Sequence, residues 1–180
     1  MSWMRIWVGG FPVFVEKAKG VYITDVDGHD YLDLCLGDTG GLCGHAHPKI
    51  VGAIANQLKN RGTTTMLPTE DCIWVGEELA RRFKLPYWQI LMSATDANRM
   101  ALKAAREYTG RHLILAMNGT YHGSVDETLC VNFFGEMINN PGLMGPLVRN
   151  PAEMTRIVDF NDIPALEKAL APGDIACVIT

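Results

Sequence analysis

The chain has 180 residues, of which 48% are hydrophobic, and it carries 16 Lys and Arg against 20 Asp and Glu, for a formal net charge of -4. This length suits one domain, or one domain and part of another, and the apolar content is high enough to build a core, which excludes a disordered chain. The mixed charges contain no basic run, so we expect no nucleic-acid partner.

Targeting and redox features point to the cytoplasm. No stretch approaches the about 18 consecutive apolar residues of a membrane span, and residues 1–20 lack the pattern of a signal peptide, so we expect no membrane association. An odd number of cysteines without a C-x-x-C pair argues against the disulfide framework of a secreted protein. The five cysteines are Cys35, Cys43, Cys72, Cys130 and Cys177.

The first third of the chain predicts antiparallel strands followed by a helix. Short β-rich runs over 11–36 are separated by turn residues at 19–20 and 27–28, which is typical of a meander of hairpins. A Gly-rich passage covers 37–44, and the apolar spacing after it predicts a helix that stops at Gly62.

From residue 69 onward, helices and strands alternate. Thr69 is the predicted N-cap of a helix whose acidic first turn and basic last turn suit the helix dipole. The elements expected after it are a strand over 88–92, a turn over 93–96, a helix to Thr109, strands over 113–117 and 156–160, a helix over 162–170 and a strand over 175–179. This alternation predicts an α/β fold with a mainly parallel sheet.

Two further segments carry information. Residues 118–150 are rich in Gly and Pro and are expected to form a long loop, and such loops in compact domains are usually functional. The apolar run 175–179 predicts a strand buried on both faces. Because a parallel sheet rarely ends on such a strand, we expect more of the protein to follow residue 180.

The turn Ser93-Ala94-Thr95-Asp96 is a candidate anion site. It leads from a predicted strand into a helix, whose free N-H groups and positive dipole end suit a phosphate. The alternative is that Ser93, Thr95 or Asp96 only caps the helix, since caps are common and this turn lacks a glycine fingerprint. Both interpretations stay open.

The segment N-G-T-Y-H-G at 118–123 is the second candidate. It follows a predicted strand and should lie at the carboxyl edge of the sheet, where ligands of open α/β sheets bind. An aromatic ring at Tyr121 can stack on a flat ligand, and His122 can donate a hydrogen bond or move a proton. The alternative is an ordinary turn with a half-buried tyrosine.

Two patterns resemble metal sites, and we expect neither to be one. The segment D-V-D-G-H-D at 25–30 is similar to the start of an EF-hand loop, but Leu36 stands where the bidentate Glu is required, so a hairpin turn is the prediction. The segment G-H-A-H at 44–47 has no carboxylate or cysteine at ligand spacing on a shared helix.

Taken in chain order, these pieces resemble the class III, fold-type I aminotransferases, which use pyridoxal phosphate. The matching stretches are GVYITDVDGHDYLDLCLG, GHAHPKIVGAI, LPTED, SATDANRMALKAAREYTGR, GTYHG, VDFNDIPALEKAL and IACVIT. Within the family the chain is similar to the glutamate-1-semialdehyde aminomutase branch and most similar to the β-amino-acid (β-phenylalanine) aminotransferases. The resemblance implies a β-meander and helix of the small domain over 1–62 and an incomplete cofactor-binding large domain over 63–180.

The resemblance also implies a cofactor site. It places the phosphate of pyridoxal phosphate at the backbone of Ala94 and Thr95, with the Thr95 hydroxyl as an added donor. It places Tyr121 on the pyridine ring, with His122 and Gly123 beside it. The physical argument agrees, because a phosphate suits a helix N-terminus and a flat cationic ring suits an aromatic face.

Several positions depart from the family pattern. Ala94 replaces a glycine and Asp96 a glutamate of the usual Ser-Gly-Thr-Glu turn. The resemblance offers Arg5 and Asp38 as substrate residues, and Gly37-Asp38 stands where the aminomutases have Ser-Trp, which favours an aminotransferase. The Schiff-base lysine and the aspartate that pairs with the ring nitrogen lie beyond residue 180, so we assign no catalytic residue and expect the chain alone to be inactive.

The implied function is transfer of an amino group from a β-amino acid or related amine to a keto acid, by a protein that is a homodimer when complete. One alternative is an enzyme like glutamate-1-semialdehyde aminomutase. The other is a non-catalytic truncated paralogue that acts as a binding or dimer partner.

Overall fold

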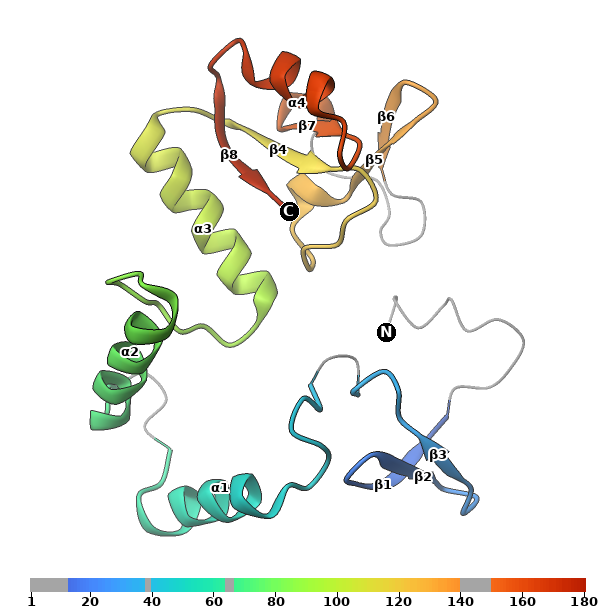
Figure 1. Cartoon of the computed structure of the whole chain (residues 1–180), viewed down its shortest axis with the longest axis vertical. Coiled ribbons are helices and arrows are strands. Elements are labelled where there is room, and N and C mark those ends of the chain that lie inside the picture. The colour runs from blue at the N-terminus through green and yellow to red at the C-terminus, as the bar shows by residue number, and fades with distance from the viewer. Residues whose placement is uncertain (1–12, 38–39, 64–66, 140–149) are drawn as a thin grey trace. The chain divides into compact units, whose positions relative to one another are not determined.

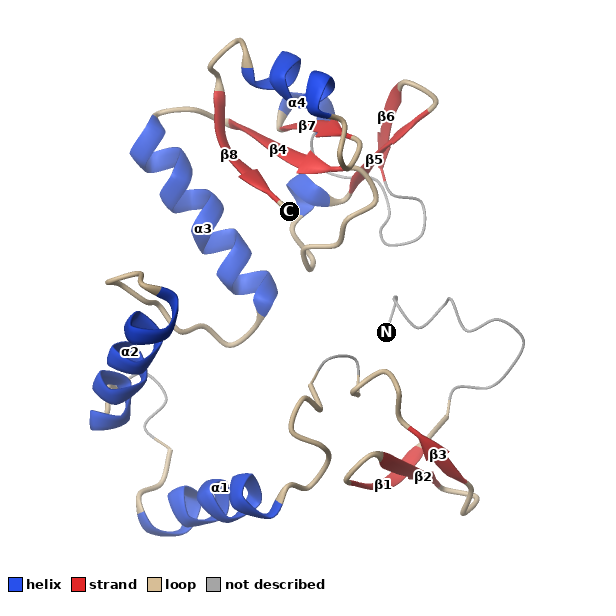
Figure 2. Ribbon diagram, viewed as in Figure 1, coloured by secondary structure: helices blue, strands red, loops and turns tan. Residues whose placement is uncertain are grey.

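The computed structural model describes residues 13–37, 40–63, 67–139 and 150–180, and Figures 1 and 2 show the elements that these residues form. The chain divides into two compact units, an N-terminal unit that ends at Trp88 and a C-terminal unit over Gln89–Thr180. The domain boundary expected after residue 62 stays a prediction about the complete protein.

The N-terminal unit begins with a three-stranded antiparallel meander. Strands β1 (Val15–Lys19), β2 (Tyr22–Asp25) and β3 (Asp30–Leu32) pair in the order β1-β2-β3, as the sequence predicts. The turn residues Gly20 and Gly28 have φ values of 60° and 86°. Glycine adopts this left-handed region at little cost, which explains why both turns contain it.

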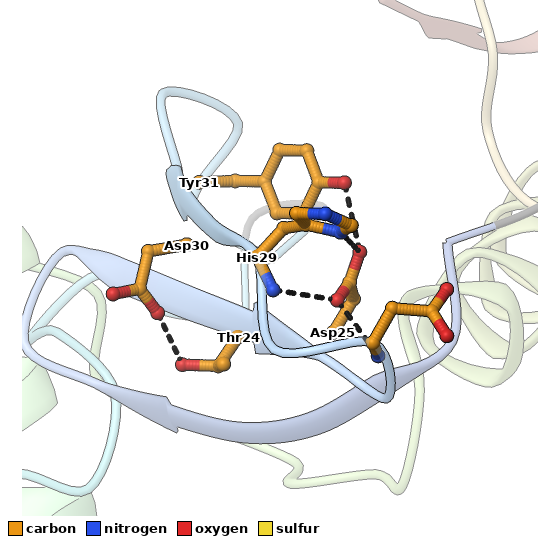
Figure 3. Close-up of polar contacts among 6 residues, drawn as sticks. Thr24, Asp25, His29, Asp30 and Tyr31 are labelled. Atoms are coloured by element: carbon orange, nitrogen blue, oxygen red, sulfur yellow. Dashed lines mark hydrogen bonds and ion pairs between the residues drawn. The ribbon is translucent and has the colours of Figure 1, made fainter.

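The Asp25 carboxylate organises the turn between β2 and β3 (Figure 3). One of its oxygens accepts the backbone amides of Asp27 at 3.0 Å and His29 at 2.8 Å. The other accepts the Tyr31 hydroxyl at 2.8 Å and lies 3.1 Å from Nδ1 of His29. The four contacts gather both strands of the turn around one carboxylate. The segment that resembles an EF-hand loop is therefore a hairpin turn, as expected.

A second carboxylate, that of Asp33, holds both ends of the Gly-rich passage. It accepts the amides of Cys35 at 3.0 Å and Gly37 at 2.7 Å, and it lies 2.6 Å from Nε2 of His45. His45 also pairs with Gly20 through two backbone hydrogen bonds. The hydrogen bond from His45, together with those from the two amides, lowers the pKa of Asp33. The G-H-A-H segment is thus joined to the meander by an Asp-His contact.

Two amphipathic helices complete the N-terminal unit. They are α1 (Pro48–Asn60), which starts at a proline, and α2 (Glu70–Phe83). Thr69 is the N-cap residue of α2 as predicted, but its hydroxyl donates to Asp71 at 3.3 Å and does not cap the backbone. No residue of either helix is buried, and several apolar side chains are largely exposed, such as Ile54 at 55%.

The C-terminal unit is built on a parallel sheet, which confirms the predicted fold class (Figure 2). The sheet has the strand order β7-β4-β8, and both neighbours run parallel to β4. The elements are α3 (Ala94–Thr109), β4 (Leu113–Met117), β7 (Thr155–Val158), α4 (Ile163–Leu170) and β8 (Ile175–Ile179). Short turns η2 (Asp126–Thr128) and η3 (Pro151–Glu153) lie between them in sequence.

The central strand β4 carries the core. Ile114 and Leu115 are both 0% exposed, and successive strand residues point to opposite faces of the sheet. Ile114 packs with Leu102 of α3, whereas Leu115 packs with Val158 and Ile175. Partly buried residues of α4 join the second cluster. The two faces of β4 are therefore covered by different elements, and the strand is held rigidly between them.

Two predicted strands differ from the structure. Residues 88–92 form no strand, because strand assignment needs a ladder of hydrogen bonds and no described residue pairs with this apolar segment. The run over 175–179 is a strand, but it lies at the edge of the described three-stranded sheet. Only Ile175 of it is buried and Val178 is 43% exposed, so burial on both faces is wrong for this chain.

The expected long loop over 118–150 also contains regular structure. Strands β5 (Cys130–Phe133) and β6 (Glu136–Asn139) form an antiparallel hairpin. Its two turn residues, Phe134 and Gly135, have φ values of 50° and 88°. Two positive φ values in a two-residue turn match the right-handed twist of a hairpin. Residues 140–149 lie outside the described part.

The structure also bears on membrane-spanning helices and on the cysteines. No helix in the described ranges is long and apolar enough to cross a membrane. All five cysteines are free thiols, and Cys130 is buried, which raises its pKa to about 11.

The Asp25 turn predicts a loss of stability in acid. Burial by itself would raise the pKa of Asp25, but the hydrogen bonds from His29, Tyr31 and Asp27 outweigh it and lower the pKa from 3.8 to about 2. The contribution of this carboxylate to stability is therefore complete above pH 3.8 and is lost as the pH falls from 3.8 to about 2. Thermal unfolding followed by circular dichroism across this range should show the loss.

The Asp25→Asn variant should lack this part of the acid sensitivity. Asp27→Asn is the matched control, because Asp27 contributes its backbone amide to the turn and the substitution keeps that amide. An acid profile of Asp25→Asn that matches the wild type would contradict the assignment.

Candidate functional site

Ser93 caps α3 and organises the turn that the sequence singled out. Its hydroxyl oxygen accepts the amide of Asp96 at 3.1 Å and donates to the Asp96 carboxylate at 2.7 Å, while its carbonyl accepts the amide of Ala97 at 3.0 Å. The Ser93 hydroxyl is thus a side-chain N-cap, and the Asp96 carboxylate holds that hydroxyl in place. The capping interpretation is therefore confirmed for Ser93.

The cap leaves two neighbouring amides available. Within the described part of the chain, no group accepts the N-H of Ala94 or Thr95. Unpaired N-H groups and the positive end of the helix dipole together favour an anion at this point. Ala94 has no positive φ, so alanine fits the turn without backbone strain. Capping and anion binding use different amides and are compatible.

The loop after β4 is fastened to the start of α3. The Ser124 amide donates to the Thr95 hydroxyl oxygen at 3.1 Å, and the Asn98 side chain donates to the His122 carbonyl at 2.9 Å. A Cβ atom added at Gly123 would clash with Oγ1 of Thr95, so only glycine permits this approach. Because Thr95 Oγ1 accepts from Ser124, its own proton is free to be donated to a ligand.

Tyr121 and His122 differ sharply in exposure. Tyr121 is 64% exposed, so its ring is accessible for stacking, whereas His122 is 8% exposed. His122 Nε2 lies 2.9 Å from the hydroxyl of Thr120, which in turn lies 2.7 Å from the Met117 carbonyl. Burial lowers the pKa of His122. The structure therefore gathers Ala94, Thr95, Tyr121, His122 and Gly123 on two contacting segments of the C-terminal unit.

Asn118, the first residue of the candidate segment 118–123, has a structural role at this edge, although no individual function was predicted for it. Its amide group donates to the Asp159 carboxylate at 2.8 Å and to the Asn132 carbonyl at 3.3 Å. Its oxygen accepts the Asn132 amide at 3.0 Å. Asn118 thus ties the carboxyl ends of β4 and β7 to the β5-β6 hairpin. The sequence feature that could have indicated this role is a polar residue directly after a buried parallel strand.

The described part of this site includes neither the two predicted substrate residues nor the main hollow of the C-terminal unit. Arg5 and Asp38 fall outside the described residues. A hollow of about 450 Å³ lies between β7, α4 and the hairpin, and it includes none of the predicted site residues. Arg156 in its wall is engaged with Asp174 at 2.5 and 2.6 Å. We therefore place the candidate site at the α3 turn and not in this hollow.

Comparison with known proteins identifies the family. A family model described as aminotransferase class-III matches residues 4–180. The match extends over nearly the whole chain, so the chain belongs to the class III aminotransferases. The resemblance carried by the sequence motifs is confirmed.

Curated relatives are named glutamate-1-semialdehyde 2,1-aminomutase. The protein of Tropheryma whipplei (strain Twist) is 32% identical over 182 residues, which cover 96% of this chain and 38% of that protein. The protein of Neisseria meningitidis serogroup A is 36% identical over 180 residues, which cover 96% and 41%. The chain thus spans about 40% of the length of the curated relatives it matches.

Solved structures confirm the fold. A glutamate-1-semialdehyde aminomutase from Pseudomonas aeruginosa PAO1 is 50% identical with a TM-score of 0.92, over 100% of this chain and 40% of that one. An omega-transaminase from Sphaerobacter thermophilus is 31% identical with a TM-score of 0.82, over 97% and 42%. A β-phenylalanine aminotransferase from Variovorax paradoxus is 23% identical with a TM-score of 0.79, over 97% of this chain and 38% of that one. At this identity the similarity shows the fold alone.

The close approach at Gly123 predicts a specific cost for a methyl group. Gly123 and Gly119 have φ values of 82° and 77°, but an added Cβ at Gly119 meets nothing within 4 Å. Both alanine variants incur the left-handed strain of about 1–2 kcal/mol. Gly123→Ala should add about 1–3 kcal/mol because of overpacking against Thr95.

Denaturant unfolding of Gly123→Ala and Gly119→Ala measures the difference directly. Equal losses of stability in the two variants would contradict the close contact between Gly123 and Thr95.

Proposed function

We propose that this chain supplies the phosphate-binding and ring-stacking part of a pyridoxal-phosphate-dependent enzyme that transfers amino groups. The observation that carries the proposal is the pair of free amides at Ala94 and Thr95, with the Thr95 hydroxyl held beside them by Ser124. Three donors at a helix N-terminus suit a phosphate dianion. A solved class III relative described as a transaminase with PLP bound supports the same cofactor.

The residues present fit this cofactor. When bound, pyridoxal phosphate supplies an electron sink for carbanion chemistry. The amides of Ala94 and Thr95 would hold its phosphate, and the exposed ring of Tyr121 would stack on its pyridine ring. Gly123 contributes by its lack of a side chain, because the loop that carries Tyr121 could not otherwise lie against α3.

The lysines of the C-terminal unit lie away from this turn. Lys103 follows Ala94 by nine positions on α3, which corresponds to about 13 Å along the helix axis. Lys168 is on α4 and lines the separate hollow. We propose that the lysine for covalent attachment and the aspartate for the ring nitrogen belong to the part of the longer relatives that this chain does not span.

The reaction we propose is amino transfer from a β-amino acid or related amine to a keto acid. The Gly37-Asp38 pair supports this assignment. The aminomutase reaction is the second candidate, because the 50% identical structure carries that name. An assay of the longer protein distinguishes them: a transaminase requires an added keto acid for turnover, whereas a mutase converts one substrate alone.

Further parts of the proposal concern the complete protein. We propose a cytoplasmic homodimer with a small amine donor and a keto acid as substrates. The non-catalytic paralogue is the alternative, and size-exclusion chromatography with a full-length subunit tests it. A chain that never associates with such a subunit would argue against that alternative.

Thr95 provides a direct test of the phosphate site. In the protein that contains this chain, Thr95→Val should weaken pyridoxal phosphate binding about tenfold or more, because one hydrogen bond to a charged group is lost. Thr95→Ser should bind nearly as well as the wild type. Fluorescence titration with pyridoxal phosphate, and competition by inorganic phosphate, measures both.

Thr69→Val is the matched control. Thr69 lies at the N-terminus of α2, but its side chain makes no capping hydrogen bond. Unchanged affinity in Thr95→Val would remove Thr95 from the site.

Borohydride reduction of the cofactor-loaded longer protein tests the lysine argument. Peptide mapping by mass spectrometry should find the label on none of the seven lysines of this chain. They are Lys17, Lys19, Lys49, Lys59, Lys84, Lys103 and Lys168. A label on Lys103 or Lys168 would overturn the argument.

A further inference from the structure

The hydrogen bonds around Thr120 fix where the proton of His122 lies. Thr120 Oγ1 is 2.7 Å from the Met117 carbonyl oxygen and 2.9 Å from Nε2 of His122. A carbonyl oxygen only accepts, so the single hydroxyl proton of Thr120 is donated to Met117. The contact with His122 is then a hydrogen bond only if Nε2 carries a proton and donates it to Thr120.

The other ring nitrogen is left without a proton. His122 is buried, with 8% of its surface exposed, and burial lowers its pKa, which favours the neutral imidazole. A neutral ring has one proton, and Nε2 holds it. Nδ1 therefore presents a lone pair, and no described residue donates a hydrogen bond to it.

Contacts before and after His122 fix the backbone that carries its ring. The Asn98 side chain holds the His122 carbonyl at 2.9 Å, and the next two residues are fixed by the contacts of Gly123 and Ser124 with Thr95. These contacts anchor the backbone after the Cα atom of His122, and the hydrogen bond from the Thr120 hydroxyl to the Met117 carbonyl anchors the turn before it. On this backbone, Nε2 is the ring nitrogen that lies within hydrogen-bond distance of the Thr120 hydroxyl.

We propose that Thr120 is a positioning residue that locks His122 in the neutral Nε2-H tautomer and so presents Nδ1 as a hydrogen-bond acceptor for an N-H or O-H donor at the carboxyl edge of β4. In this state His122 accepts a proton or a hydrogen bond and does not act as an acid. The assignment of this donor to the bound cofactor or its surroundings rests on the proposed function. The tautomer of His122 does not depend on that function.

Nitrogen-15 NMR of histidine-labelled protein tests the tautomer without any ligand. The chain has five histidines, and His122→Gln identifies the signals of His122 by their loss. Near pH 7.5, the wild type should show one proton-bearing ring nitrogen at Nε2 and one bare nitrogen, well downfield, at Nδ1. Thr120→Ser should keep this pattern, and Thr120→Val should move both shifts toward a mixture of tautomers.

Thr109→Val is the matched control. The Thr109 hydroxyl also donates to a backbone carbonyl, that of Ala105 at 2.7 Å, and accepts an N-H, that of Arg111 at 3.2 Å, but it does not contact a histidine. This variant should leave the His122 shifts at their wild-type values.

A wild-type spectrum with the proton on Nδ1, or with both nitrogens protonated, overturns the proposal even if no variant folds. Unchanged His122 shifts in a folded Thr120→Val protein overturn the role of Thr120. Loss of pyridoxal phosphate binding with the predicted tautomer intact would count against the proposed function and leave this inference standing.

Discussion

The contact between Gly123 and Thr95 is the constraint on which the candidate site depends. It brings the loop after β4 to the first turn of α3 at a distance that excludes any side chain at position 123. The Ser124 amide then reaches the Thr95 hydroxyl, and Asn98 reaches the His122 carbonyl. Because of this junction, the carboxyl edge of the sheet and the positive end of a helix dipole form one surface and not two.

The first turn of α3 satisfies two demands with different groups. Ser93 uses its hydroxyl and its carbonyl for the amides of Asp96 and Ala97, which stabilises the helix. The amides of Ala94 and Thr95 are left for a ligand. Helix N-termini have four amides without intrahelical partners, so a cap need not compete with a ligand. Alanine fits position 94 of this turn without backbone strain, since its φ is not positive.

The N-terminal unit is organised by polar contacts around two aspartates. Asp25 gathers two amides, a hydroxyl and an imidazole in one hairpin turn, and Asp33 joins the two ends of the Gly-rich passage. Neither arrangement depends on a large apolar core, and no residue of α1 or α2 is buried. The C-terminal unit differs, because it is built around the buried strand β4, and the polar groups that follow β4 lie at its carboxyl end.

The sequence alone determined most of the local structure and the family. The spacing of apolar residues, the turn glycines and the helix caps predicted the meander, all four helices and strands β4, β7 and β8, since these depend on neighbours a few residues apart. Only the tertiary structure decided that residues 88–92 do not form a strand and that β8 lies at an edge, because pairing partners are distant in sequence. Likewise, Ala94, Thr95 and Tyr121 were chosen from motifs. The need for glycine at 123 and the bridge made by Asn118 follow from contacts between segments about 14 to 41 residues apart, which no local pattern encodes. The proton position proposed for His122 follows from contacts within the turn 117–122, whose distances only the structure gives.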